Sequence, residues 1–232
     1  MSVLKVLMIV TSQATMPISE GGNGQPTGIW YEELATPYYV LQDAGVQVDI
    51  ASIKGGAVPI DPRSLRAKDR NPASVNRFES DPAALQKLKT SMKLDDVHVA
   101  GYSAVFLPGG HGPMWDEANS KTLAEVISTA WQNGQVVGAV CHGGAGLINA
   151  KDSNGEPLVK DRRVSAFSNA EEGDGKVPFH LETRLRELGA KYESGANFQP
   201  FAIQDGKLIT GQNPASSEQV AKMILAEIKN NK

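Results

Sequence analysis

The chain has 232 residues, a formal net charge of −3 at pH 7 and a sequence pI of about 5.8. This length suffices for one large α/β domain with a substantial core, which we expect to span residues 1–232. No basic stripe indicates nucleic acid binding, and no apolar run approaches the roughly 20 residues of a membrane span. The single cysteine and the lack of a secretory leader pattern at the start lead us to expect a protein of the reducing cytoplasm.

The first third of the chain alternates the patterns of strand and helix. Apolar runs indicate buried strands, Gly- and Pro-rich stretches indicate loops, and an N-cap residue before an apolar-periodic stretch indicates a helix. These rules predict strands at 3–10 and 46–51, a loop at 12–28, and a helix at 29–43 with Thr27 as N-cap, Pro37 as a kink and Gly45 at its end.

Residues 54–94 have the least regular pattern. Proline recurs through them, and only Pro82–Ser91 has the composition of a helix. Long irregular segments in α/β proteins often close over a functional crevice. We therefore interpret residues 54–94, here named the cover segment, as a loop-rich cover of the site.

The rest of the chain returns to strand–helix alternation. Predicted strands lie at 104–107, 136–140 and 163–167, amphipathic helices at 120–133, 178–188 and 218–229, and a hairpin of 201–203 with 207–210 turns at Asp205-Gly206. Alternation of this kind predicts a flavodoxin-like, doubly wound and mostly parallel sheet flanked by helices.

The cysteine lies where the strand 136–140 meets a glycine-rich turn. Cys141 and His142 precede a predicted helix at 143–148, so the thiol has the position of a nucleophile elbow. In such sheets the ligand crevice lies at the carboxyl ends of the strands. A helix N-terminus behind the sulfur predicts a lowered thiol pKa. The alternative is a small buried cysteine beside a histidine that caps the helix.

Other candidate residues follow neighbouring strand ends. The amides of Gly109 and Gly110, with His111, come after the strand 104–107 and are suited to bind an oxyanion or substrate. Acids follow two further strands: Glu32 and Glu33 in the first helix, and Glu171 and Glu172 after the strand 163–167. One of them could share the thiol proton and another could orient His142, or both pairs could be ordinary solvated acids. No histidine or cysteine spacing predicts a metal site, and we expect no cofactor.

At these residues the chain resembles the ThiJ/PfpI superfamily, which has a class I glutamine-amidotransferase-like fold, and it is most similar to the heat-shock-type glyoxalase III and deglycase branch. The shared motifs extend along nearly the whole chain and are Thr27-Gly28-x-x-x-x-Glu33 with Pro37, Phe106–Gly112, Ala139–Gly143, Phe167–Glu172 and Leu208–Ser216.

The resemblance implies a role for each candidate. Cys141 would be the nucleophile, His142 the triad histidine, Glu33 the acid that contacts the thiol, and Glu172 the third triad member, with Glu171 as the fallback. The backbones of Gly110 and His142 would stabilise the oxyanion.

The chain departs from the family pattern at one position. Many relatives have proline after Cys-His-Gly, whereas this chain has Gly144, which we expect to loosen the elbow. Amidotransferases of the fold also need a late His-x-Glu, and no histidine follows His180, so glutamine hydrolysis is disfavoured.

The resemblance further implies that a homodimer converts a small 2-oxoaldehyde, methylglyoxal, to lactate without glutathione, or removes early glycation adducts. Two other functions stay open at this point. One is a different thiol amidase or peptidase of the same fold, and the other is a holding chaperone or oxidation sensor that uses Cys141 as a redox group.

Overall fold

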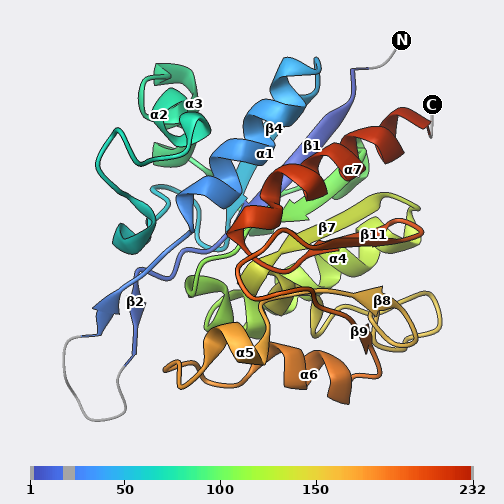
Figure 1. Cartoon of the computed structure of the whole chain (residues 1–232). Helices are drawn as coiled ribbons and strands as arrows, with labels where there is room; N and C mark the ends of the chain where they lie inside the picture. Colours follow the sequence, from blue (N-terminus) through green and yellow to red (C-terminus); the bar gives the residue numbers. More distant parts are fainter. Residues whose placement is uncertain (1–2, 18–23, 231–232) are drawn as a thin grey trace.

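The computed structural model describes residues 3–17 and 24–230 (Figure 1). Seven of its strands form the central sheet in the order β10-β11-β7-β6-β1-β4-β5. All neighbouring pairs are parallel except the β10–β11 hairpin. The strands are β1 (Lys5–Val10), β4 (Gln47–Ser52), β5 (Met92–Lys93), β6 (Ala104–Leu107), β7 (Val136–Val140), β10 (Ala202–Asp205) and β11 (Leu208–Gly211).

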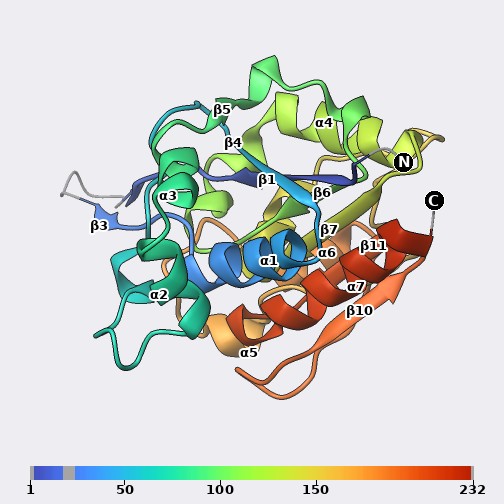
Figure 2. The same ribbon diagram turned by 90° about the horizontal axis from the view of Figure 1, so that it is seen from above.

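Helices cover both faces of the sheet, which confirms the predicted fold class. Figure 2 shows α4 (Lys121–Gln132) on one face and α1 (Tyr31–Asp43) with α7 (Ser217–Asn230) on the other. Alternate residues of β1 divide between the two cores, as the pleat of a strand requires: Met8 packs toward α1 and α7, and Ile9 packs toward α4. The short helix α6 (Leu181–Glu187) joins the core on the α4 side. No described helix is both long and apolar enough to cross a bilayer.

The β6–β7 pairing brings the two motif-bearing strands together. Leu107 lies beside Ala139, so the glycine motif after β6 and the cysteine after β7 leave the same edge of the sheet. The prediction that these strands are neighbours is confirmed. Because β7 is flanked by β6 and β11, the elbow lies near the middle of that edge.

Several local predictions are wrong. The predicted loop 12–28 contains a small antiparallel pair, β2 (Thr15–Met16) and β3 (Gln25–Pro26), and its residues 18–23 lie outside the described part. Helix α1 begins after Trp30 without a side-chain cap, while the Thr27 hydroxyl donates to Asp61 instead. The strand expected at 163–167 is only β8 (Arg163–Val164), paired with β9 (Lys191–Tyr192) in a separate sheet.

The cover segment is more helical than its composition predicts. It contains α2 (Ala73–Glu79) as well as the expected helix, α3 (Pro82–Lys89). Phe78 of α2 is fully buried and packs edge-on against Tyr31, Tyr38 and Tyr39 of α1. These contacts hold α2 against α1, so the expectation that only Pro82–Ser91 is helical is wrong, while the role of the segment as a cover of the site stays a prediction.

Candidate active site

The backbone at Cys141 has the strained geometry of an elbow. Its φ is 57°, a left-handed value that costs energy for a residue with a side chain. The chain continues directly into a 3-10 helix, Cys141–Leu147, rather than the expected α-helix at 143–148. Only glycine fits at Gly143, because a Cβ there would lie 2.0 Å from the carbonyl oxygen of Leu107. The tight approach to β6 therefore fixes the bend and places the thiol outside the strand.

The thiol lies in a buried environment beside Glu33, and its predicted low pKa is wrong. Burial raises the pKa of Cys141, and the carboxyl of Glu33 raises it further when it is ionised. The amides of His142 and Gly110 donate toward the sulfur and partly oppose that rise. A short 3-10 helix offers less dipole than the predicted helix, so desolvation dominates.

Glu33 is fully buried in the first turn of α1, and burial raises its pKa to about 8. The amide of Gly109 donates to Oε2 at 2.5 Å. Oε1 has no hydrogen-bond partner among the described residues. The carboxyl nevertheless lies close enough to the sulfur of Cys141 for each group to shift the pKa of the other. With this pKa the carboxyl holds its proton at pH 7. A protonated Glu33 removes the like charge beside the sulfur and leaves the two amides to favour the thiolate.

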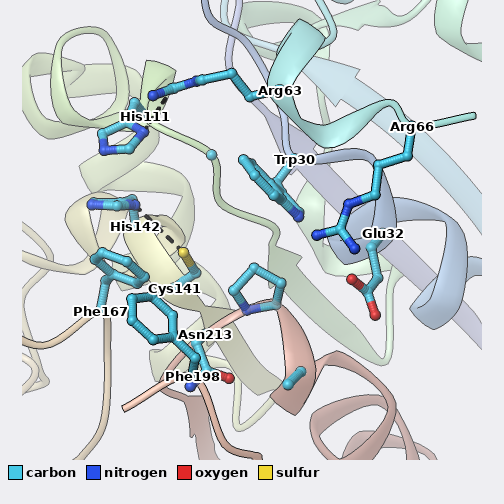
Figure 3. Close-up of a pocket in the computed structure, with 13 residues that line it drawn as sticks. Trp30, Glu32, Arg63, Arg66, His111, Cys141, His142, Phe167, Phe198 and Asn213 are labelled. Atoms are coloured by element: carbon cyan, nitrogen blue, oxygen red, sulfur yellow. Dashed lines mark hydrogen bonds between the residues drawn. The ribbon is translucent and has the colours of Figure 1, made fainter. Parts of the chain in front are cut away.

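His142 joins the thiol to Glu172. Its Nδ1 lies 3.4 Å from the sulfur of Cys141, and its Nε2 makes a short hydrogen bond with Oε2 of Glu172 (Figure 3 shows the first of these contacts). Burial lowers the pKa of His142, so the ring is neutral at pH 7. Although burial opposes it, hydrogen bonds from His111 and His142 hold the pKa of Glu172 well below its usual range. The ionised Glu172 therefore keeps the proton on Nε2 and turns the basic Nδ1 toward the thiol.

The other acid of that pair, Glu171, has a different position. In the short helix α5 (Asn169–Glu172) it accepts hydrogen bonds from Ser168, from the amide of Phe198 and from Asn213. It does not contact His142. Its carboxylate instead ties the Phe198 loop and the segment after β11 to α5.

Gly144 is buried in the elbow. A Cβ at this position would lie 3.1 Å from Cβ of Ala166 and 3.5 Å from Cδ2 of Leu181. Its surroundings are therefore close-packed.

Three of the predicted site residues form a cluster that sequence spacing could not indicate. The ligand atoms of His111, His142 and Glu172 lie within 4.8 Å of one another, the reach of a metal ion. Nδ1 of His111 accepts a hydrogen bond from Arg63 at 3.0 Å, because a guanidinium only donates. Nε2 of that ring then carries a proton and has no lone pair for a cation. The donors in this arrangement do not fit a metal.

A cavity of about 390 Å³ opens onto the sulfur. Figure 3 shows Trp30, Phe167 and Phe198 around it, with Arg63 and Arg66 entering from the cover segment. Sequence reasoning did not single out these residues. Their positions depend on contacts between segments that are distant in the sequence, which no local pattern indicates.

Residues 28–227 match the DJ-1/PfpI family. The glutathione-independent glyoxalase HSP31 of Saccharomyces cerevisiae is 29% identical, with 97% of this chain and 98% of that protein aligned.

Two crystal structures superpose on the chain. Rapid Encystment Protein 24 KDa of Francisella tularensis has a TM-score of 0.90 at 39% identity, over 97% of this chain and 99% of that one. Glyoxalase III of Candida albicans has a TM-score of 0.85 at 29% identity, over 97% of each chain. The family match covers Cys141 together with Glu33, His142 and Glu172, and the chain therefore belongs to the DJ-1/PfpI family.

Proposed function

We propose that this protein is a glutathione-independent glyoxalase that converts methylglyoxal to lactate. One observation carries the proposal: a buried thiol lies between a neutral imidazole at 3.4 Å and a carboxyl whose pKa is about 8. Groups that titrate near neutral pH both accept and donate protons efficiently. The similarity to proteins named glyoxalases supports the same substrate class.

The reaction we propose uses the sulfur as a nucleophile. Nδ1 of His142 takes the thiol proton, and the Cys141 thiolate adds to the aldehyde carbon of methylglyoxal. The amides of Gly110 and His142 lie beside the sulfur, where they can donate to the oxyanion that forms on the oxygen of the bound aldehyde. Glu33 or His142 then moves a proton from the former aldehyde carbon to its neighbour through an enediol. Water hydrolyses the resulting lactoyl thioester, which releases lactate and restores the thiol.

Purified protein incubated with methylglyoxal and no glutathione tests the proposal. We expect D-lactate to form with the wild type and not with Cys141→Ala. Equal turnover by the two proteins would refute the thiol mechanism. Glu33→Gln keeps the carboxyl's size and neutrality but not its acid–base chemistry, and we expect turnover to fall by about two powers of ten or more.

The size of the cavity supports a second substrate class. At about 390 Å³ it is far larger than a three-carbon aldehyde needs, and three aromatic rings line it. We therefore propose that early adducts of methylglyoxal with amines enter the same site and are released through the same hemithioacetal. Release of free amine from a preformed adduct, lost in Cys141→Ala, tests this activity.

The resemblance to this branch also supports a single-domain protein that acts as a homodimer in the cytoplasm during carbonyl stress. Sedimentation equilibrium of the purified chain tests the dimer. Imaging of the tagged protein in its host tests the compartment.

A further inference from the structure

We propose that Arg63 fixes His111 as its Nε2–H tautomer, and that His111 in this form holds Glu172 in position for His142. Arg63 and His111 are then positioning residues for the acid–base pair. Neither residue makes a hydrogen bond with the sulfur, and both act on it through Glu172 and His142. The inference rests on the proposed function for its kinetic consequences, but not for the hydrogen-bonding arrangement itself.

The first support comes from the donor at Nδ1 of His111. Nη2 of Arg63 lies 3.0 Å from that nitrogen. A guanidinium has donors and no acceptor, so Nδ1 must accept. A neutral imidazole that accepts at Nδ1 carries its single proton at Nε2.

The second support comes from the other side of the ring. Nε2 of His111 lies 3.1 Å from Oε1 of Glu172. An ionised carboxylate only accepts, so Nε2 must donate. The same tautomer thus follows independently from the partner of each nitrogen.

Arg63 is itself held in place from outside the site. Its Nε donates to Oδ1 of Asp61 at 2.9 Å, and its Nη2 donates to Oδ2 of the same carboxylate at 2.6 Å. Asp61 is completely buried and also accepts from the amide of Arg63 and the hydroxyl of Thr27. A bidentate pair with a buried, multiply bonded carboxylate fixes the direction of the guanidinium. The chain of contacts is Asp61, Arg63, His111, Glu172, His142.

Glu172 has one partner on each oxygen. Oε1 accepts from His111 and Oε2 from His142, so the carboxylate plane cannot rotate without breaking one bond. The donor at Oε1 also draws charge away from Oε2. Glu172 therefore orients His142 but competes weakly for its proton, which leaves Nδ1 free to act as the base.

The charges that face His142 determine the direction of the effect. Burial lowers the pKa of His142, the hydrogen bond with Glu172 raises it, and the charge of Arg63 lowers it. Cys141 and Glu33 lie on the sulfur side of the ring, and Glu32 and Arg66 line the same cavity. Loss of His111 removes the donor at Oε1 and makes Glu172 a stronger hydrogen-bond acceptor for His142. This change raises the pKa of His142.

The direct test is nitrogen-15 NMR of the imidazole rings, which the four histidines of the chain make tractable. We expect His111 of the wild type as the Nε2–H tautomer. In Asp61→Asn/Arg63→Met, which removes the ion pair without leaving a buried charge, we expect the Nδ1–H form to become populated. Arg66→Met is the matched control, because it removes a neighbouring cavity arginine that does not contact His111, and the His111 signals should not change.

Kinetics test the consequence for the base. In His111→Leu we expect kcat to fall about tenfold, the size of one charge-assisted hydrogen bond, with KM within about threefold. The acidic limb of kcat/KM should move to higher pH. His111→Gln retains a donor near Glu172 and should restore most of kcat and the position of the limb.

The outcomes separate this inference from the proposed function. An Nδ1–H tautomer in the wild type, or a His111 tautomer that is the same in the double variant, overturns the inference whether or not methylglyoxal is a substrate. An unchanged acidic limb in His111→Leu overturns the positioning role. A wild type that has the expected tautomer but forms no lactate supports the arrangement and refutes only the glyoxalase proposal.

Discussion

Glu117 lies buried behind the elbow with no hydrogen-bond partner for either carboxyl oxygen among the described residues. It is 2% exposed, and burial together with Asp116 raises its pKa well above the usual value. A Cβ on Gly146 would lie 3.3 Å from Oε2, which places the carboxyl against the 3-10 helix that carries the thiol. We predict that Glu117→Met, an unbranched apolar replacement of similar length, stabilises the protein.

The size of the effect depends on pH. An unsatisfied buried polar group costs about 1–3 kcal/mol, so a gain of about 2 kcal/mol is expected even when the carboxyl is neutral. The folded state binds the Glu117 proton more tightly than the unfolded state, whose pKa is near 4.5. The stability of the wild type therefore falls as pH rises above that value, by up to about 1.4 kcal/mol per unit until the folded pKa is reached. The variant lacks this fall, so its advantage grows from pH 4.5 upward.

Thermal unfolding followed by circular dichroism at pH 5 and pH 7.5 measures both terms. For a chain of this length about 2 kcal/mol corresponds to about 4–8 °C in Tm. Glu125→Met on the exposed face of α4 is the control and should change Tm little at either pH. A Glu117→Met variant that is less stable than the wild type, or whose advantage is the same at both pH values, would refute the reasoning.

Three further substitutions test the site. Glu172→Gln should lower kcat at least tenfold, because it removes the charge that orients His142, and it should also lower Tm, because the two imidazole donors lose an ionised acceptor. Glu171→Gln should leave lactate formation little changed, while Tm falls by an amount equivalent to about 1–3 kcal/mol as its donors lose an ionised acceptor. That loss should be present above pH 4.5 and vanish as pH falls through the lowered pKa of Glu171. Gly109→Ala should abolish activity, since its Cβ would lie 2.7 Å from Oε2 of Glu33; an active variant would show that this packing is not required.

The elbow could be predicted because its determinants are local. A strand rich in β-branched residues, several small residues and a cysteine occur within a dozen positions. The pairing of β6 with β7 follows from the helix that connects them. The left-handed backbone at Cys141 agrees with that pattern. Helix α2 was missed because its seven residues bury only Val75 and Phe78, too few to establish a period.

The electrostatics of the site could not be read from the same residues. The predicted low pKa of Cys141 considered a helix end but not the depth of burial, which depends on packing of the whole sheet. Arg63 lies 48 residues from His111 in the chain, so no spacing rule connects them. Without the tautomer that this contact imposes, His111 appeared only as one residue of a glycine motif.

The aromatic packing between α1 and α2 has a consequence beyond stability. Phe78 and the three tyrosines hold the same segment that supplies Asp61 and Arg63. Regions joined to a core by a few contacts open locally more often than the whole protein unfolds. Such an opening would withdraw the guanidinium while leaving the sheet, the elbow and the thiol intact. The pKa of His142 would then depend on how well Phe78 packs against the tyrosines of α1. A higher temperature, or a mutation near these rings, would shift the pH dependence of the reaction under conditions in which the sheet is still folded.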